Sequence, residues 1–267
     1  MGTATGGPEI TPRQAERLLD GLSEIVSRAA QATLAIPFSS VQHRIKDDLS
    51  PVTAADEASE ALILEGLARL LPDVPVVAEE SVGRTAPGAL GPSFLVVDPL
   101  DGTKEFITGS GDFTVNIALL RDFTPVMGVI YAPVTDTLYY GASGKAFMRG
   151  DDGVEKEIAV RAVPPEGLTV VASKRHGDPG ALEEFLRGKK VAEMISRSSS
   201  LKFCSIAAGE ADFYPRLGPT CEWDTAAGDA ILRAAGGRVA TLEDKPFVYG
   251  KKDQRFLNAG FMAFGAE

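Results

Sequence analysis

The chain has 267 residues, of which 44% are hydrophobic, and its formal net charge is −10 at pH 7. This size and composition allow a substantial core in one large domain or in two closely packed ones. The acidic balance argues against duplex nucleic acid and against an anionic membrane surface as partners.

The N-terminal part of the chain is predicted to be helical after a loose tail of residues 1–11. Apolar side chains recur at helical spacing over residues 12–36, and Pro37 ends this pattern. Residues 43–53 are polar and precede a second amphipathic segment at residues 54–71. Because they lie between two helices, residues 43–53 are a candidate lid that closes over substrate.

The middle of the chain predicts strands. The runs 74–78 and 94–97 are short and apolar and contain β-branched residues, which is typical of buried strands. Further β-rich runs predict an antiparallel meander, and a Gly-Asp-Asp-Gly turn predicts a hairpin tip; they are residues 114–120, 126–131 and 137–140, with the turn at 150–153. After Pro164-Pro165, strand and helix patterns alternate at residues 168–172, 181–186, 191–195 and 201–208.

Two cysteines, Cys204 and Cys221, occur in the chain, and their spacing does not indicate a disulfide framework. No stretch approaches ~18 consecutive apolar residues, and no secretory signal is found at the N-terminus. These features predict a cytoplasmic protein without a membrane span.

The run Asp98–Thr103 sets two carboxylates and a hydroxyl on one tight turn at the end of a predicted strand. Pro99 cannot donate to a β-ladder and Gly102 accepts unusual backbone angles, so the chain is expected to leave the sheet here. Asp98 and Asp101 then come close together and repel each other unless a divalent cation neutralises them. All-oxygen ligation suits Mg²⁺, Ca²⁺ or Mn²⁺. The alternative is an Asx-type turn whose aspartates cap backbone amides.

Other carboxylates occupy comparable positions. Glu79 and Glu80 follow the predicted strand at residues 74–78, so a second strand delivers carboxylates at its end. Asp224 lies in a predicted helix opening, and Asp56 lies in the first turn of another helix. Each of these two aspartates could cap its own helix or point into a shared site, and both interpretations remain open.

Taken in order, these motifs resemble the lithium-sensitive, magnesium-dependent phosphatase superfamily of inositol monophosphatase and fructose bisphosphatase. The resemblance runs from about Ser50 to the Ala-Ala-Gly-Gly run that ends at Gly237. It implies an α+β fold, a layered αβαβα sandwich of the inositol monophosphatase type. The halves, residues 12–163 and 164–267, are expected to form one compact unit with the active site between them.

The resemblance also implies a two- or three-ion Mg²⁺ site. The metal ligands that it implies are Glu79, Asp98, the Leu100 carbonyl, Asp101 and Asp224. Asp56 and Thr103 would handle the attacking water, with Glu79 as a further catalytic residue, while the role of Glu80 is left open. Li⁺ and Ca²⁺ are expected to inhibit. Metal-activated water needs no nucleophilic side chain, which agrees with the absence of a Gly-x-Ser-x-Gly or Cys-x-x-Cys motif in the sequence.

Within this superfamily, the run Lys104-Glu105-Phe106 after the metal turn is similar to the 3′(2′),5′-bisphosphate nucleotidases, as is Ser198–Cys204. This branch removes the 3′-phosphate of adenosine 3′,5′-bisphosphate and leaves AMP. The alternative enzyme is an inositol monophosphatase or another sugar-phosphate phosphatase of the same fold. A non-catalytic binding protein is a third hypothesis, and the intact set of acidic residues counts against it.

The substrate-binding residues implied by the resemblance are Gly102, Thr103, Lys104, His176, Ser199, Lys202 and Arg216. The expected partner is a small-molecule phosphate ester, not a nucleic acid polymer, and a homodimer is left open. Taken alone, Lys202 could instead be a solvated charge facing Glu210, and Arg216 could simply pair with Glu222.

Overall fold

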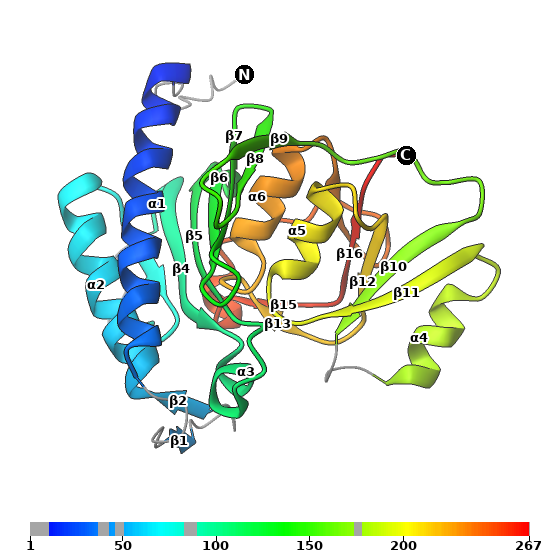
Figure 1. The fold of residues 1–267 in the computed structure, drawn as a ribbon, viewed down its shortest axis with the longest axis horizontal. Helices are drawn as coiled ribbons and strands as arrows, with labels where there is room; N and C mark the ends of the chain where they lie inside the picture. The colour runs from blue at the N-terminus through cyan, green and yellow to red at the C-terminus, as the bar shows by residue number, and fades with distance from the viewer. Residues whose placement is uncertain (1–10, 37–42, 46–50, 83–89, 174–177, 267) are drawn as a thin grey trace.

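The computed structural model describes residues 11–36, 43–45, 51–82, 90–173 and 178–266. Within these ranges, a seven-stranded and a five-stranded sheet form the framework (Figure 1). Two short pairs of strands complete the β-structure: β1 (His43–Ile45) with β2 (Pro51–Thr53), and β13 (Thr220–Cys221) with β15 (Leu257–Asn258). The candidate lid falls partly on β1 and β2, while residues 46–50 lie outside the described ranges.

The seven-stranded sheet runs in the order β3-β4-β5-β6-β7-β8-β9. Its strands are β3 (Val76–Ala78), β4 (Ser93–Asp101), β5 (Thr114–Arg121), β6 (Thr124–Ala132), β7 (Thr137–Ala142), β8 (Lys145–Arg149) and β9 (Glu155–Ile158). The first pair is parallel and all later pairs are antiparallel. The predicted meander and the hairpin tip at residues 150–153 are therefore confirmed.

The five-stranded sheet has the order β11-β10-β12-β16-β14 and mixes parallel with antiparallel pairs. Its strands are β10 (Leu168–Ser173), β11 (Val191–Arg197), β12 (Phe213–Arg216), β14 (Arg238–Thr241) and β16 (Phe261–Phe264). The alternating strand and helix patterns of the second half thus appear in the structure, and the late strands β14 and β16 add to them.

Helices cover both sheets in layers (Figure 1). They are α1 (Pro12–Leu34), α2 (Ala54–Leu70), α3 (Thr103–Thr108), α4 (Pro179–Leu186), α5 (Leu201–Ala207) and α6 (Ala226–Ala234), and a 3-10 turn η2 spans Lys252–Gln254. The helices α1 and α2 pack on one face of the seven-stranded sheet, while α5 and α6 lie between the two sheets. The side chains of α4 pack beside the apolar cluster on the outer face of the five-stranded sheet. The order helix, sheet, helix, sheet, helix confirms the predicted αβαβα sandwich.

The contact between α6 and the larger sheet is close because small residues line it. A Cβ atom at Gly128 of β6 would lie 2.4 Å from the Ala227 carbonyl oxygen of α6. This packing fixes the start of α6 against the sheet. As a result, residues from both parts of the chain meet at the end of β4 and the start of β5.

The structure corrects one local prediction and refines another. The sheet does not end after Asp98, because β4 continues to Asp101 through an irregularity that takes up Pro99 without needing its missing N–H. The helix α6 begins at Ala226, so Asp224 lies just before it, near its first turn as the sequence predicted. The Asp224 carboxylate accepts the backbone N–H of Cys221 at 2.7 Å and so caps the turn before the helix.

Candidate metal and phosphate site

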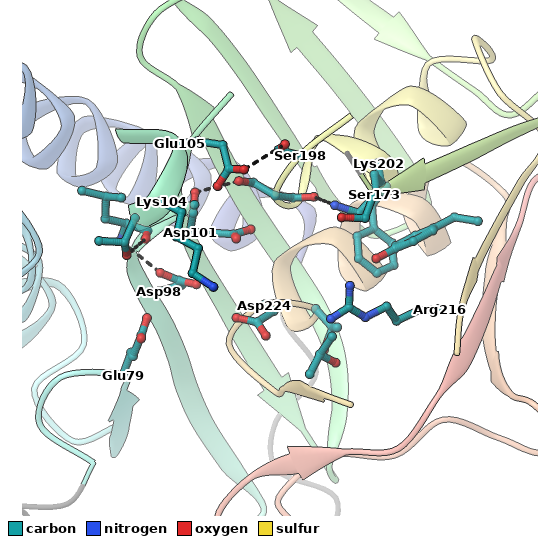
Figure 2. A pocket seen from close by; sticks show the side chains of 18 residues that line it. Glu79, Asp98, Asp101, Lys104, Glu105, Ser173, Ser198, Lys202, Arg216 and Asp224 are labelled. Atoms are coloured by element: carbon teal, nitrogen blue, oxygen red, sulfur yellow. Dashed lines mark hydrogen bonds between the residues drawn. The ribbon is translucent and has the colours of Figure 1, made fainter. Parts of the chain in front are cut away.

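A pocket of about 240 Å³ lies where the end of β4 meets the segments around α5, β12 and α6 (Figure 2). Residues from both parts of the chain line it: Glu79, Asp98, Leu100, Asp101, Gly102, Thr103, Lys104, Glu105, Ser173, Ser198, Ser199, Lys202, Phe203, Tyr214, Arg216, Thr220, Asp224 and Thr225. The structure thus brings together nearly all residues that the sequence singled out for metal and substrate.

Three carboxylates form a cluster at one side of this pocket. One oxygen from each of Asp98, Asp101 and Asp224 lies within 4.8 Å of the others. The irregularity in β4 makes this possible, because Asp98 faces Asn116 and Asp101 faces Thr114 across the ladder. Three residues of β4 thus span two residues of β5, which turns both aspartates to the same face.

The cluster is electrostatically unfavourable without a cation. Burial raises the pKa of Asp98 well above its ordinary value, and the charges of Glu79, Asp101 and Asp224 raise it further. Burial and the Asp101 carboxylate also raise the pKa of Asp224. Since hard divalent cations prefer oxygen ligands, this donor set fits Mg²⁺.

The remaining implied metal ligands border the same cluster. Glu79 lines the pocket from the end of β3 and acts on the pKa of Asp98 (Figure 2). The Leu100 carbonyl oxygen lies 3.3 Å from the Thr103 hydroxyl. The backbone N–H of Glu80 donates a hydrogen bond to the Glu60 carboxylate at 2.8 Å.

Asp56 takes part in the capping of its own helix and also contacts Thr103, which lines the pocket, so the two interpretations left open by the sequence are compatible. One of its carboxylate oxygens accepts the N–H and the hydroxyl of Thr53, at 2.8 and 2.6 Å, which closes a capping box at the start of α2. Its other oxygen accepts the Thr103 hydroxyl at 3.0 Å. Burial raises the pKa of Asp56, so its carboxylate is a stronger base than an exposed one.

The turn after Asp101 depends on glycine. Gly102 has φ +99°, and a Cβ atom there would lie 2.4 Å from the Ser199 hydroxyl oxygen. The Ser199 hydroxyl lies 2.8 Å from the Asp101 carbonyl oxygen and 2.9 Å from that of Asp112. A hydroxyl has one hydrogen to donate, so Ser199 fastens this turn, and its donation to a substrate remains a prediction.

The opposite side of the pocket carries positive charge. Lys202 is only 5% exposed, so the interpretation of a solvated charge is wrong. Its ammonium group donates to the Ser199 carbonyl at 2.5 Å and lies 5.3 Å from the centre of the Tyr214 ring. Burial lowers the pKa of Lys202 to about 8, although Asp101 works against this shift.

Arg216 extends toward the pocket from β12 (Figure 2). One of its terminal nitrogens donates to the Pro219 carbonyl at 3.1 Å, and its Nε is buried without a hydrogen-bond partner. The Thr220 hydroxyl is buried without a partner as well. Glu222, the partner considered from the sequence, accepts hydrogen bonds from Gly250 and Lys251 instead.

The structure describes one of the two remaining predicted substrate residues, Lys104, and does not describe the other, His176. Lys104 lines the pocket from α3 and extends into it (Figure 2). His176 lies outside the described residues, so its role stays a prediction.

Sequence reasoning assigned no role to Ser200 and Asn116, although both contact the Asp101 carboxylate. Asn116 had a signal, because it is a lone polar residue in the apolar run of β5 and is 1% exposed. Ser200 had no such signal in the sequence, because a serine before a helix is commonly a cap.

The family model described as the inositol monophosphatase family matches residues 13–260. The chain belongs to this family. Among curated relatives, the 3′(2′),5′-bisphosphate nucleotidase CysQ of Salmonella typhimurium is 44% identical over 91% of this chain and 98% of its own length. The Escherichia coli K12 protein of the same name is 43% identical, with the same coverage.

Solved structures of family members share the fold of this chain. CysQ from Bacteroides thetaiotaomicron, 34% identical, superposes with a TM-score of 0.75 over 95% of this chain and 98% of its own. The inositol monophosphatase from Anabaena, 26% identical, has a TM-score of 0.74 over 94% and 91%. Among the described residues of this chain, no helix is both long and apolar enough for a membrane span.

Proposed function

We propose that the protein is a metal-dependent 3′(2′),5′-bisphosphate nucleotidase, which releases the 3′-phosphate of adenosine 3′,5′-bisphosphate as inorganic phosphate and leaves AMP. One observation carries this proposal: a single pocket has a cluster of carboxylates on one side and the cationic groups of Lys202 and Arg216 on the other. The CysQ relatives at 43–44% identity, matched over 98% of their length, support the same activity.

The cationic side of the pocket suits the second phosphate of a bisphosphorylated nucleotide. Lys202 supplies an ammonium group, and Arg216 supplies an unpartnered buried Nε, at which an anionic oxygen would satisfy the missing hydrogen bond. Thr220 offers a hydroxyl in the same region. An inositol monophosphate has no second phosphate to place there, which favours the nucleotidase over that alternative.

The acidic side suits Mg²⁺, held by Asp98, Asp101 and Asp224, with Glu79 and the Leu100 carbonyl beside them. Bound divalent cations neutralise charge on the phosphate and acidify a water molecule. We expect Li⁺ and Ca²⁺ to inhibit; Ca²⁺ takes longer bonds and a looser geometry than Mg²⁺. Phosphate release at limiting Mg²⁺, with millimolar Li⁺ or Ca²⁺ added, tests this expectation, and an unchanged rate contradicts it.

We expect Asp56 and Thr103 to handle the attacking water. Because the Thr103 hydroxyl donates to Asp56, its oxygen lone pair is left to accept a hydrogen bond from the water. The raised pKa of Asp56 helps it to draw the proton through this contact as the water oxygen forms its bond to phosphorus. The bond from phosphorus to the 3′ oxygen breaks, and that oxygen takes a proton from solvent water.

We also propose that the enzyme works in the cytoplasm. Cys204 and Cys221 are both free thiols in the structure, as expected in a reducing compartment. Burial raises the pKa of Cys204, which makes this thiol unreactive.

A substrate panel tests the proposed activity. Phosphate release should be measured with Mg²⁺ on adenosine 3′,5′-bisphosphate, its sulfated precursor 3′-phosphoadenosine 5′-phosphosulfate, an inositol bisphosphate and inositol 1-phosphate. The proposal predicts the highest kcat/KM on the nucleotide substrates and loss of turnover with EDTA. A preference for inositol 1-phosphate would instead support the alternative phosphatase.

A further inference from the structure

Ser200 occupies a cap position without acting as a cap. It is the residue before α5 and is 1% exposed, yet its side chain makes no capping hydrogen bond to that helix. A serine in this place usually accepts a backbone N–H, which stabilises a helix by about 1 kcal/mol. The hydroxyl of Ser200 is directed to other groups, and a local preference that is set aside in this way indicates a role elsewhere.

Those other groups belong to the acidic cluster. The Ser200 hydroxyl lies 2.7 Å from Oδ2 of Asp101 and 3.0 Å from the backbone carbonyl oxygen of Asp224. It therefore contacts both segments that carry the clustered carboxylates, one at the end of β4 and the other just before α6. The shorter contact is to a charged acceptor, which is where a hydroxyl hydrogen bond is strongest.

Asn116 orients this hydroxyl. Its side-chain Nδ2 donates to the Ser200 oxygen at 2.9 Å and to Oδ2 of Asp101 at 3.3 Å. The Ser200 oxygen thus accepts from Asn116, and its single hydrogen goes to the closer and charged acceptor, Oδ2 of Asp101, which leaves the Asp224 carbonyl in contact only. Two donors then meet on one carboxylate oxygen of Asp101 and hold the carboxylate plane in one orientation.

We infer that Ser200, oriented by Asn116, is a positioning residue for the cation site, and that it sets the Asp101 carboxylate against the segment of Asp224. This inference rests on the proposed function, because it requires the cluster to bind divalent cations. Partners that orient a metal ligand typically affect metal affinity or activity by about 10- to 100-fold. Ser200 itself would touch neither metal nor substrate.

The test is Mn²⁺ binding without substrate, measured from the electron paramagnetic resonance signal of the free ion. Ser200→Ala should bind Mn²⁺ roughly tenfold more weakly than wild type. The matched control is Ser205→Ala, which truncates a buried serine within α5 that has no hydrogen bond to the cluster among the described residues; it should bind like wild type. If the folded Ser200→Ala protein binds Mn²⁺ with wild-type affinity, the inference is wrong and the proposed function still stands. Wild-type protein that binds no Mn²⁺ overturns both.

A second pair of variants decides the matter if Ser200→Ala does not fold. Ser200→Thr and Ser200→Val add the same bulk and differ in the hydroxyl, so Val should bind Mn²⁺ roughly tenfold more weakly than Thr. Equal affinities in this pair would mean that packing, not the hydrogen bond, matters at this position. In phosphate release, Ser200→Ala should raise the half-saturating Mg²⁺ concentration and leave the KM for the nucleotide at saturating Mg²⁺ unchanged. A raised KM with an unchanged Mg²⁺ requirement would contradict the inference.

Discussion

The three acids of the pocket cluster and the single acid Asp212 have opposite surroundings. Asp98, Asp101 and Asp224 face one another in the pocket, and among the described residues no ion pair involves any of them. Asp212, at the start of β12, is paired with Arg161 at 2.9 Å and accepts the Thr169 N–H at 2.7 Å.

The pKa shifts follow these surroundings. Burial alone would raise the pKa of Asp212, but the hydrogen bonds from Arg161 and Thr169 and the guanidinium charge bring it below its ordinary value. In the cluster, burial and neighbouring charges both raise the pKa of Asp98. Asp212 therefore contributes to folding by itself, whereas the repulsion within the cluster is what a bound cation would relieve, as expected of a functional site.

The largest expected effect is on turnover and comes from the cluster. Asp101→Asn keeps the shape of the side chain and removes a ligand charge, so kcat should fall by roughly a thousandfold or more, given the several kcal/mol that metal-ion catalysis supplies. Phosphate release from adenosine 3′,5′-bisphosphate measures this loss. Circular dichroism should match that of wild type, and near-normal turnover by the folded variant would contradict the assignment of Asp101.

The next effect concerns the opposite wall of the pocket. Lys202→Met keeps the length of this buried side chain and removes its charge. The KM for adenosine 3′,5′-bisphosphate should rise by roughly tenfold or more, which corresponds to about 1.5–3 kcal/mol for a hydrogen bond to a charged group. A substrate that lacks the second phosphate serves as the control and should be hydrolysed almost as before. Equal losses on both substrates would mean that Lys202 serves the reacting phosphate or the fold.

A smaller effect, on stability alone, is expected from the paired acid. Asp212→Asn should lower the free energy of unfolding by about 1–3 kcal/mol, because it weakens hydrogen bonds to a charged group. Urea unfolding at pH 7 measures the difference, with the exposed Asp253→Asn as a control that changes stability by less than about 0.5 kcal/mol. The comparison fails if Asp212→Asn is as stable as wild type, or if its kcat falls like that of Asp101→Asn.

The stability difference between wild type and Asp212→Asn should also depend on pH, in a direction that follows from the pKa of Asp212. The pKa of Asp212 is lower in the folded protein than in the unfolded chain, so its stabilisation is complete above the unfolded value of about 4 and is lost as pH falls toward the folded value. The stability difference between wild type and Asp212→Asn should therefore be constant from pH 6 to 8 and shrink below about pH 4. A difference that grows on acidification would contradict this account.

The sequence predicted most of the framework and the acidic residues, because both leave local signals. The buried strand before Asp98 and the glycine at position 102 are visible in the run of residues itself, and the order of the motifs indicated the family. The hydrogen bonds of Ser200 and the burial of Lys202 were not predictable from local patterns. They depend on how α5 packs between the two sheets, which joins residues about a hundred positions apart in the chain.

The central claim is that the acidic cluster is a cation site whose charges oppose folding when no cation is bound. Thermal unfolding of wild type and Asp101→Asn, each with EDTA and with Mg²⁺, tests it most directly. With EDTA, the variant should melt at a higher temperature than wild type, because it removes a repelling charge. With Mg²⁺, wild type should gain more and the order should reverse. A wild-type protein that is the more stable of the two with EDTA, or that gains nothing from Mg²⁺, would contradict the claim.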